Sequence, residues 1–382
     1  MKKTFLYIAL FVLLVTEASA QLTSQYRYHI FDDYLLNPAY VGMQDYYPVN
    51  IGRDQRFLGL SNSTPQTYYL AINSRVGEGF VFEKDGKINK FFEKFGNIAL
   101  GLQLFQYNYG PGSETNIGVT YGYHLDLNQN VKRKNQRKLV LALTPRLRRM
   151  GFNQFNFQTE NDALDGTSYE GVFDPMLGDT QFIRSWMFSS DFGAMYKSIH
   201  GEFGVAALDF IQTRNRLDTK VLFYGDSLQS DPLGLYYTTK LMVNTKLTFI
   251  EMYASKLLDV KFVPSVAALY GPNINSYEFF VDLALQSIFK QTIAGVRGET
   301  YMIGELGLNI SHTRIFEPTT NIQPYITLDF KNIMITYAQT INFDLDLVKV
   351  KGIYGGNQIS VIFKISNDRT VYASPKASRV WY

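Results

Sequence analysis

The chain has 382 residues, a formal net charge of +3 and no cysteine. The small net charge gives no indication of a nucleic-acid partner. The missing thiols exclude disulfides, thiolate metal sites, a cysteine nucleophile and a lipid anchor on cysteine. Charged residues make up 19% of the sequence, below the roughly 25% of soluble domains. Tyrosine and phenylalanine are frequent, with 27 and 29 copies, which favours β-structure and the aromatic girdles of membrane barrels.

The first 20 residues predict a signal peptide. Two lysines precede an apolar run from Phe5 to Val15, and Ala18-Ser19-Ala20 forms a small-residue cleavage site. The run is too short for a stable transmembrane helix, and no later stretch reaches about 18 consecutive apolar residues. We therefore expect cleavage near Ala20-Gln21 and export of the rest of the chain. An uncleaved anchor is the alternative.

Residues 21–47 form an N-terminal segment that differs from the rest of the chain. The segment is dense in aromatic side chains and shows no regular alternation, and Asn37-Pro38 stops any local helix and favours a turn. We expect it to lie in the periplasm, where it would offer a docking surface, or to fill the mouth of a barrel as a plug.

Residues 48–366 are dominated by alternation with a period of two, which is typical of β-strands. The pattern recurs in roughly 14 to 16 segments of about 10 residues, and some of these are weak, such as 260–270 and 292–299. That length matches a tilted strand of an outer-membrane barrel. Residues 116–127, NIGVTYGYHLDL, give the clearest case, with an apolar parity made of Ile117, Val119, Tyr121, Tyr123, Leu125 and Leu127.

We predict an all-β fold: a transmembrane outer-membrane antiparallel β-barrel of about 14 strands over residues 48–366, followed by a C-terminal tail at 367–382. Soluble two-sheet sandwiches also alternate, so a secreted or periplasmic β-protein is the alternative. Two features favour lipid as the partner of the apolar faces. The segments are longer than usual soluble strands, and the polar parity often carries glycine, alanine and full charges.

Two links between strands differ in charge. With an even strand number, both chain ends lie in the periplasm. The longest link, residues 150–184, is then extracellular, and between Gly151 and Ile183 it has acidic residues but no lysine or arginine. The basic link at 128–137 is then periplasmic. We interpret the basic link as a solvated turn, with contact to lipid phosphates or an acidic partner as the alternative.

No residue pattern predicts catalysis or a metal site. The four histidines are scattered without metal-ligand spacing, and no nucleophile or phosphate-binding motif is present. His124, Glu278 and Asp282 lie on polar parities of their segments, so we interpret them as lumen lining. The acidic link lacks the ordered spacing of a calcium loop. We predict no enzyme activity, no cofactor and no bound metal.

Five short motifs follow one another along the chain: YLLNPAYVG (34–42), RDQRFLGLSNSTPQT (53–67), TYGYHLDL (120–127), FVPSVAALY (262–270) and GGNQISVIFKI (355–365). They resemble, in order, motifs of PorP/SprF-type type IX secretion system membrane proteins of Bacteroidetes. The similarity covers residues 34–365 and is weakest between 150 and 260. It departs at Phe57, where the family usually has tryptophan, and at Asn357-Gln358, where a His-Glu pair is common.

The resemblance implies an outer-membrane barrel without enzymatic activity, in contact with membrane lipid. Its implied partners are secretion components in the periplasm and an exported adhesin or other cargo protein, as in gliding motility. A porin-like solute channel is the alternative function. Within the two N-terminal motifs we expect six residues to contribute to partner binding: Asn37, Pro38, Tyr40, Gly42, Arg53 and Arg56.

Overall fold

A computed structural model describes most of the residues predicted to form strands, together with part of the N-terminal segment. The signal peptide with its cleavage site, the C-terminal tail at 367–382 and most of both charged links lie outside the described residues. The described ranges are 32–44, 46–58, 65–76, 97–109, 112–127, 137–153, 182–198, 201–213, 215–216, 234–235, 239–247, 250–254, 258–271, 276–293, 296–314, 318–330, 332–343 and 354–365.

The described residues form two short helices and a series of strands. No helix among them is long and apolar enough to cross a membrane. The elements are α2 (Asp33–Leu36), η2 (Pro38–Tyr40), β1 (Tyr47–Leu58), β2 (Gln66–Arg75), β3 (Ile98–Tyr109), β4 (Gly112–Asp126), β5 (Lys138–Asn153), β6 (Phe182–Lys197), β7 (Gly201–Gln212), β8 (Asn215–Arg216), β9 (Gly234–Leu235), β10 (Lys240–Leu247), β11 (Ile250–Ala254), β12 (Leu258–Gly271), β13 (Ser276–Ile293), β14 (Val296–Arg314), β15 (Pro318–Asp329), β16 (Ile333–Phe343) and β17 (Tyr354–Ile365).

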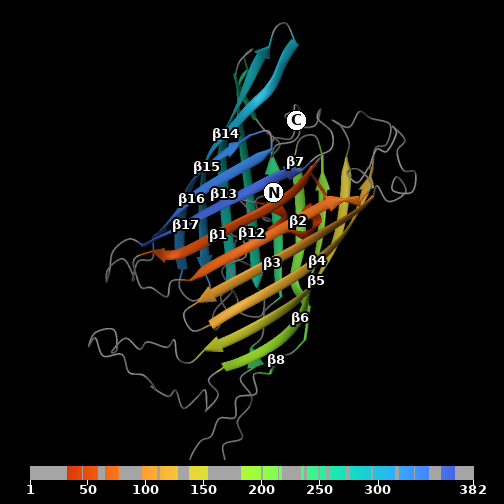
Figure 1. Ribbon diagram of the computed structural model, residues 1–382, viewed down its shortest axis with the longest axis vertical. Helices are drawn as coiled ribbons and strands as arrows, with labels where there is room; N and C mark the ends of the chain where they lie inside the picture. The colour runs from red at the N-terminus through yellow and green to blue at the C-terminus, as the bar shows by residue number, and fades with distance from the viewer. Residues whose placement is uncertain are drawn as a thin grey trace, which may run out of the picture.

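The large sheet closes on itself. Neighbouring strands pair antiparallel around the barrel, and β17 pairs with β1. β10 and β11 pair with successive stretches of one edge of β12, Lys246 with Ser265 and Ile250 with Phe262, so they are two parts of one strand. Counted this way, the closed antiparallel barrel has 14 strands, and the predicted fold class is confirmed (Figure 1). Within the described residues, β8 and β9 pair only with each other.

The weak segment at 292–299 is not a strand of its own, so that part of the prediction is wrong. The segment spans the end of β13 and the beginning of β14, which pair as far as Ile293 with Val296. These two strands are longer than their neighbours, because β12 begins opposite Phe289 and β15 ends opposite Ile303. The alternation therefore continues past the rim of the barrel along a hairpin, which projects at the top of Figure 1.

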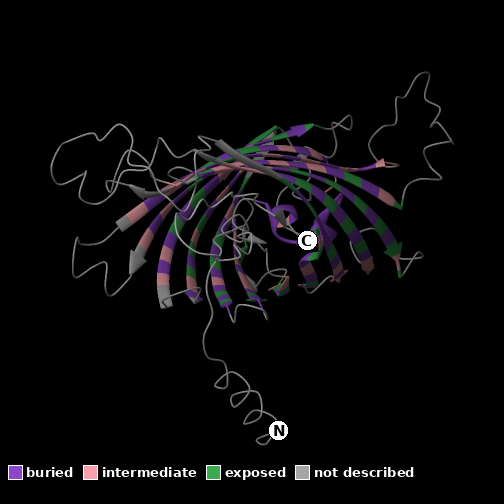
Figure 2. Cartoon of the chain, turned by 90° about the horizontal axis from the view of Figure 1, so that it is seen from below, coloured by how far each residue is buried: buried purple, intermediate pink, exposed green. Residues whose placement is uncertain are grey.

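The two faces of the wall have opposite chemistry. In β4, Val119 is 52% exposed, whereas Thr120 and His124 are fully buried. Buried and exposed residues alternate in the same way along the strands in Figure 2. The apolar parity of residues 116–127 is thus the outer, lipid-facing surface. His124, Glu278 and Asp282 are buried on the lumen side, as predicted.

The ends of the strands fix the two rims. Tyr47 pairs with Ile365, so β1 begins at the rim where β17 ends. β4 ends and β5 begins at this rim, whereas β5 ends and β6 begins at the opposite one. In an outer-membrane barrel with an even strand number, the first rim is periplasmic. The basic link therefore starts from the rim where β1 begins and β17 ends, and the acidic link starts from the opposite rim. The periplasmic and extracellular placement of the two links stays a prediction.

Candidate functional site

Residues 32–44 and 46, called the plug here, lie inside the barrel (Figure 2). α2 begins after Asp32, whose carboxylate accepts a hydrogen bond from the backbone N–H of Tyr34 at 3.0 Å. α2 ends at Asn37, which also starts η2, because its Oδ1 accepts a bond from the N–H two residues on at 2.9 Å. Pro38 suits the next position, where no helical N–H bond is needed. Asn37-Pro38 thus joins two helical turns.

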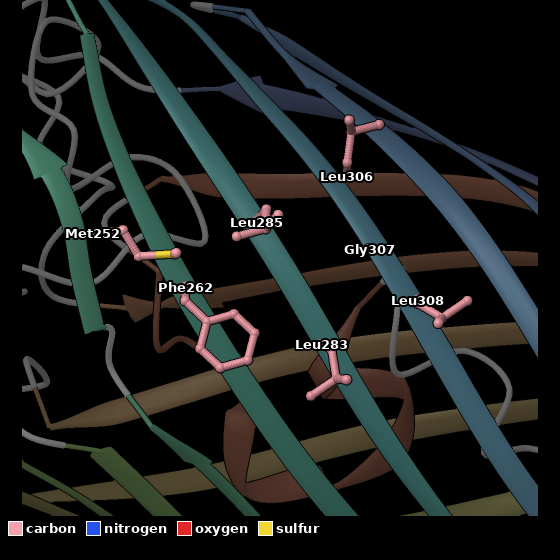
Figure 3. A pocket seen from close by; sticks show the side chains of 7 residues that line it. All are labelled: Met252, Phe262, Leu283, Leu285, Leu306, Gly307 and Leu308. Carbon is pink, nitrogen blue, oxygen red and sulfur yellow. The ribbon is translucent and has the colours of Figure 1, made fainter.

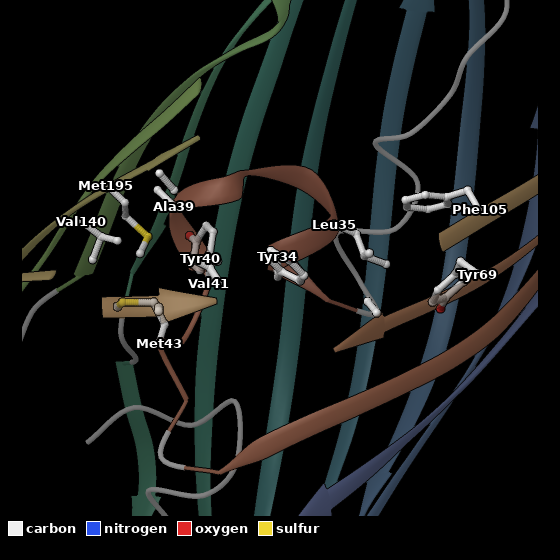
Figure 4. Close-up of a cluster of buried hydrophobic side chains, with 13 residues drawn as sticks. Tyr34, Leu35, Ala39, Tyr40, Val41, Met43, Tyr69, Phe105, Val140 and Met195 are labelled. Carbon is white, nitrogen blue, oxygen red and sulfur yellow. The ribbon is translucent and has the colours of Figure 1, made fainter. Parts of the chain in front are cut away.

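One face of the plug completes a hydrophobic cluster with the wall formed by β2 to β6 (Figure 4). The wall side chains here are mostly small or flexible, which leaves room for the large plug residues. Burying one large apolar side chain contributes roughly 2 kcal/mol, so the cluster holds the plug firmly. It contains Tyr34, Leu35, Ala39, Tyr40, Val41 and Met43 of the plug, and Tyr69, Ala71, Ala99, Phe105, Val140, Ala142 and Met195 of the wall.

The plug also reaches the opposite wall. Leu36 is 4% exposed and packs in a second cluster with residues of β7, β10, β12 and β13. Tyr46, where the plug leads into β1, packs against β16 and β17. The plug therefore touches both sides of the lumen. The wall partners of Leu36 are Ala206, Leu208, Met242, Ala267, Leu269 and Phe280, and those of Tyr46 are Met334 and Ile362.

Hydrogen bonds with β3 and β4 satisfy several of the plug's polar groups. The Tyr34 hydroxyl donates to Thr120 Oγ1 at 2.8 Å, and Gln103 Nε2 donates to the Tyr34 carbonyl at 3.0 Å. His124 Nε2 lies 2.9 Å from the carbonyl oxygen of Val41. Buried polar groups are costly unless they are paired, so these lumen residues specify where the backbone of the plug can lie.

A second set of polar contacts joins the plug to β10. Asn37 Nδ2 donates to Asn244 Oδ1 at 3.2 Å, and Asn244 Nδ2 donates to the Tyr40 hydroxyl at 2.9 Å. Lys246 Nζ forms an ion pair with Asp33 Oδ2 at 3.2 Å. Asn244 and Lys246 are neighbours on the lumen face of β10, so this one short strand contacts both helical turns of the plug.

Glycines in the wall make space for these contacts. A Cβ atom added at Gly193 would collide with the Asn37 side chain, and one at Gly101 would collide with the Tyr34 ring. Gly42 of the plug has φ +64°, which favours glycine, and its N–H donates to Asn73 Oδ1 at 2.9 Å. The walls are therefore shaped to this particular backbone path.

Two buried ion pairs stand beside the plug on β5 to β7. Arg146 pairs with Asp191 at 2.5 Å, and Arg148 pairs with Asp209 at 2.5 Å. Arg146 also donates to Gln103 Oε1 at 3.0 Å, and Gln103 binds the plug. Asp209 has φ 53°, which is uncommon outside glycine, and it stands where the pairing of β6 with β7 shifts register. The ion pairs thus brace an irregular part of the wall, and Arg146 is linked to the plug through Gln103.

Burial also determines the charge state of the plug's phenols. Burial raises the pKa of Tyr34 and of Tyr40 well above the usual value of 10.0. Both side chains are therefore neutral at physiological pH, and each is available as a hydrogen-bonding group against Thr120 or Asn244.

The far side of the lumen is lined by carboxylates and amides. The Tyr325 hydroxyl lies 3.1 Å from Asp282 Oδ2 and 3.2 Å from Glu305 Oε1, and Gln286 donates to Glu305 at 3.2 Å. A cavity between this wall and Asp33 of the plug measures about 20 Å³. Among the described residues, no group of histidine and carboxylate side chains has the arrangement of a metal site. The arrangement suits structural lining.

Residues 18–352 match the model of a family described as type IX secretion system membrane protein PorP/SprF. The chain belongs to this family. In this PorP/SprF protein, the matched range includes the whole plug and every strand from β1 to β16. The family and the fold together identify an outer-membrane β-barrel of type IX secretion. A comparison with curated protein sequences gives no match.

Solved outer-membrane proteins resemble this PorP/SprF protein at low identity. A FadL homologue of Pseudomonas aeruginosa has a TM-score of 0.40 and 10% identity, over 87% of this chain and 93% of that chain. The toluene transporter TodX of P. putida has a TM-score of 0.37 and 9% identity, over 92% and 97%. The autotransporter translocator domain of NalP from Neisseria meningitidis has a TM-score of 0.31 and 7% identity, over 85% and 90%.

The six residues predicted to bind partners fall in different places. Asn37, Pro38 and Tyr40 are buried in the plug against the wall, as is Gly42. Arg53 lies on the outer face of β1. Arg56 belongs to β1, but its side chain is outside the described part of the chain. Partner binding by these six residues stays a prediction.

The sequence does not identify the wall residues that hold the plug. It places His124 in the lumen, but it does not predict the contact of His124 with Val41, nor the contacts of Asn73, Gln103 and Asn244 with the plug. In the sequence, these residues are marked only by their position on the polar face of a predicted strand. That signal is shared by dozens of residues, so it marks the lumen without selecting a contact.

The outer wall carries an apolar hollow of about 580 Å³ over β11 to β14 (Figure 3). None of its lining residues is polar or charged. The hollow therefore belongs to the lipid-facing surface and offers no groups for chemistry. It is lined by Met252, Phe262, Leu283, Leu285, Leu306, Gly307 and Leu308.

Proposed function

We propose that this chain works by binding, as a plugged outer-membrane platform of the type IX secretion system. The platform would engage secretion components in the periplasm, hold an exported surface adhesin or other cargo, or do both. The observation that supports this proposal is the plug: its side chains pack against both sides of the lumen through two hydrophobic clusters. An interior occupied in this way suits a rigid support better than a conduit for solutes.

The contacts of the plug suggest how the predicted residues would act. Asn37 is fully buried and bonded to Asn244, so its substitution would act on a partner by changing the path of the chain that enters β1. Substituting both Asn37 and Pro38 is therefore expected to abolish partner recovery while the barrel stays folded. Unchanged recovery from such a folded variant would count against the proposal.

The decisive test is deletion of the gene followed by quantitative proteomics of the medium and the cell surface. Joint loss of many exported proteins would assign the chain to the shared secretion apparatus. Loss of a single large adhesin, with normal export of other cargo, would make it a dedicated partner of that adhesin. Unaltered export and surface display of every protein would refute both forms of the proposal.

Conductance across a planar bilayer separates the platform from the porin-like alternative. The intact plug predicts no steady current from the purified protein. Steady open pores in the full-length protein would favour a channel.

The proposed export route includes cleavage near Ala20-Gln21, and mass determination of the N-terminal peptide of the purified protein tests that step directly.

A further inference from the structure

Around β1, the apolar outer surface of the barrel ends abruptly toward one rim. On β1, outward-facing Ile51 is followed by Arg53, and on β2 Tyr68 is followed toward the same rim by Gln66. The neighbouring strands change in the same way from an apolar to a polar outward residue. These residues are Gln106 beyond Leu104 on β3, Thr115 beyond Ile117 on β4 and Asn357 beyond Ile359 on β17.

This limit lies toward the extracellular rim. β1 runs away from the periplasmic rim, so Arg53 stands above Ile51 on the extracellular side. A row of polar side chains that ends an apolar belt marks the level of the lipid headgroups. In the outer leaflet of an outer membrane, that level carries the phosphate groups of lipid A.

Arg53 is held in a fixed orientation at this level. Its guanidinium carbon lies 5.6 Å from the centre of the Tyr68 ring. Its Nη2 donates to Gln55 Oε1 at 3.0 Å and to Gln66 Oε1 at 3.3 Å, and the Tyr68 hydroxyl donates to the same Gln66 oxygen at 2.9 Å. Both Arg53 bonds come from one nitrogen, so the Nε and Nη1 hydrogens are available to an acceptor outside the described residues.

A second arginine also lies over an aromatic ring, further round the barrel. Arg149 on β5 faces outward beyond Leu147, and its guanidinium lies 5.8 Å from the ring centre of Trp186, which is 58% exposed. In the described residues, neither Arg53 nor Arg149 forms an ion pair with a carboxylate. An exposed guanidinium at Arg53 and a half-buried one at Arg149 thus lie at the edge of the hydrocarbon without an anionic partner among the described residues.

We propose that Arg53 and Arg149 each bind a phosphate group of an outer-leaflet lipid. An arginine facing hydrocarbon is unfavourable, and the cost falls near the headgroup level. A phosphate oxygen there accepts charge-assisted hydrogen bonds from the planar guanidinium fork. The aromatic ring beneath each guanidinium keeps the fork oriented. The lipid contact would fix the height and rotation of the platform in the membrane, independently of any protein partner.

Native mass spectrometry of the delipidated full-length protein tests this proposal. The probes are bisphosphorylated lipid A and dephosphorylated lipid A with the same acyl chains. We expect several-fold more adduct with the phosphorylated form for the unaltered protein. Arg53→Gln and Arg149→Gln should each reduce that preference, and the double variant should abolish it. Arg137→Gln is the matched control, because Arg137 is exposed at the periplasmic rim and the preference should persist.

Three outcomes would overturn the proposal. The first is equal adduct formation with both lipids, and the second is an unchanged preference in the double variant. The third is loss of the preference when inorganic phosphate is added at the lipid concentration, because the site would then recognise free phosphate. If Arg53→Gln instead weakens recovery of a protein partner and leaves lipid binding unchanged, the arginine serves a protein. A heat-dependent gel shift verifies that each variant is folded.

Discussion

The two halves of the lumen wall are built on different principles. Between β2 and β6 the wall is lined by glycine, alanine and flexible side chains, and its hydrophobic cluster is complete only with the plug. Between β13 and β16 the wall fills the lumen with its own side chains, since the Tyr325 ring occupies the space over Gly307 and Thr327 bonds Thr336 at 3.0 Å. One half therefore needs the N-terminal segment for most of its core, whereas the hydrophobic contacts of the other half with this segment are made by Phe280 and Met334.

The largest expected effect comes from the buried ion pairs on the plug-dependent side. Arg146→Met leaves Asp191 as a buried charge without its partner, which costs about 3–5 kcal/mol. The free energy of unfolding in lipid vesicles, measured with urea, gives the result. Arg137→Met, at an exposed position, should change it little. A loss below about 1 kcal/mol for Arg146→Met would mean that water already screens Asp191.

A smaller effect is expected from filling the space that the wall leaves for the plug. Gly193→Ala places a Cβ atom against Asn37 and should cost about 1–3 kcal/mol. Gly304→Ala is the control, because the nearest atom to its Cβ would be Phe289 Cε2 at 3.9 Å. The chain has no cysteine, so Ala39→Cys can report release of the plug through maleimide labelling. Labelling that stays slow with Gly193→Ala would contradict a tightly fitted plug.

Removing one hydroxyl from each half compares them directly. Tyr34→Phe removes the bond to Thr120, and Tyr325→Phe removes the donor shared by Asp282 and Glu305. Each loss should cost on the order of 1–2 kcal/mol. Only Tyr34→Phe should accelerate labelling at Ala39→Cys. If Tyr325→Phe accelerates it equally, the two halves are coupled and the proposed division is wrong.

The smallest effect is a pH dependence of the plug-dependent half. Because the pKa of Tyr34 is raised in the folded protein, the unfolded chain ionises this phenol first as the pH rises above about 10. The contribution of the neutral phenol is complete below that pH and is lost progressively above it. The loss of unfolding free energy between pH 9 and pH 11 should therefore be smaller in Tyr34→Phe than in the unaltered protein. Equal losses would show that Tyr34 takes no part.

The sequence predicts the wall better than it predicts the plug. Alternation depends on the two faces of each strand, so residues 116–127 and the lumen positions of His124 and Asp282 could be assigned locally. The bond between Asn37 and Asn244 joins residues 207 positions apart. Such a contact depends on how far each strand is shifted against the next around the whole barrel. No local pattern carries that information.

The lack of long-range information in local patterns also explains the wrong strand prediction at 292–299 and the burial of predicted site residues such as Asn37 and Pro38. Alternation continues through the projecting β13–β14 hairpin, so periodicity alone places a strand where the chain turns. The motif containing Asn37 and Pro38 indicated family membership, which is confirmed. Its residues could equally have served a partner or the interior, and only the contacts with Ala39 and Asn244 distinguish a structural role within the plug.

The position of the plug in the chain has a consequence for the timing of assembly. The plug precedes β1, so during synthesis it appears before every surface that will cover it. Asn244, the partner of Asn37, is synthesised 207 residues after it. Ser360, which bonds Asn50 near the barrel seam, is synthesised 310 residues after Asn50. Contacts this distant in sequence form slowly. An apolar, aromatic segment thus lacks its barrel contacts until the strands have paired, and a chaperone that shields it would have to release it before the last strand pairs with the first.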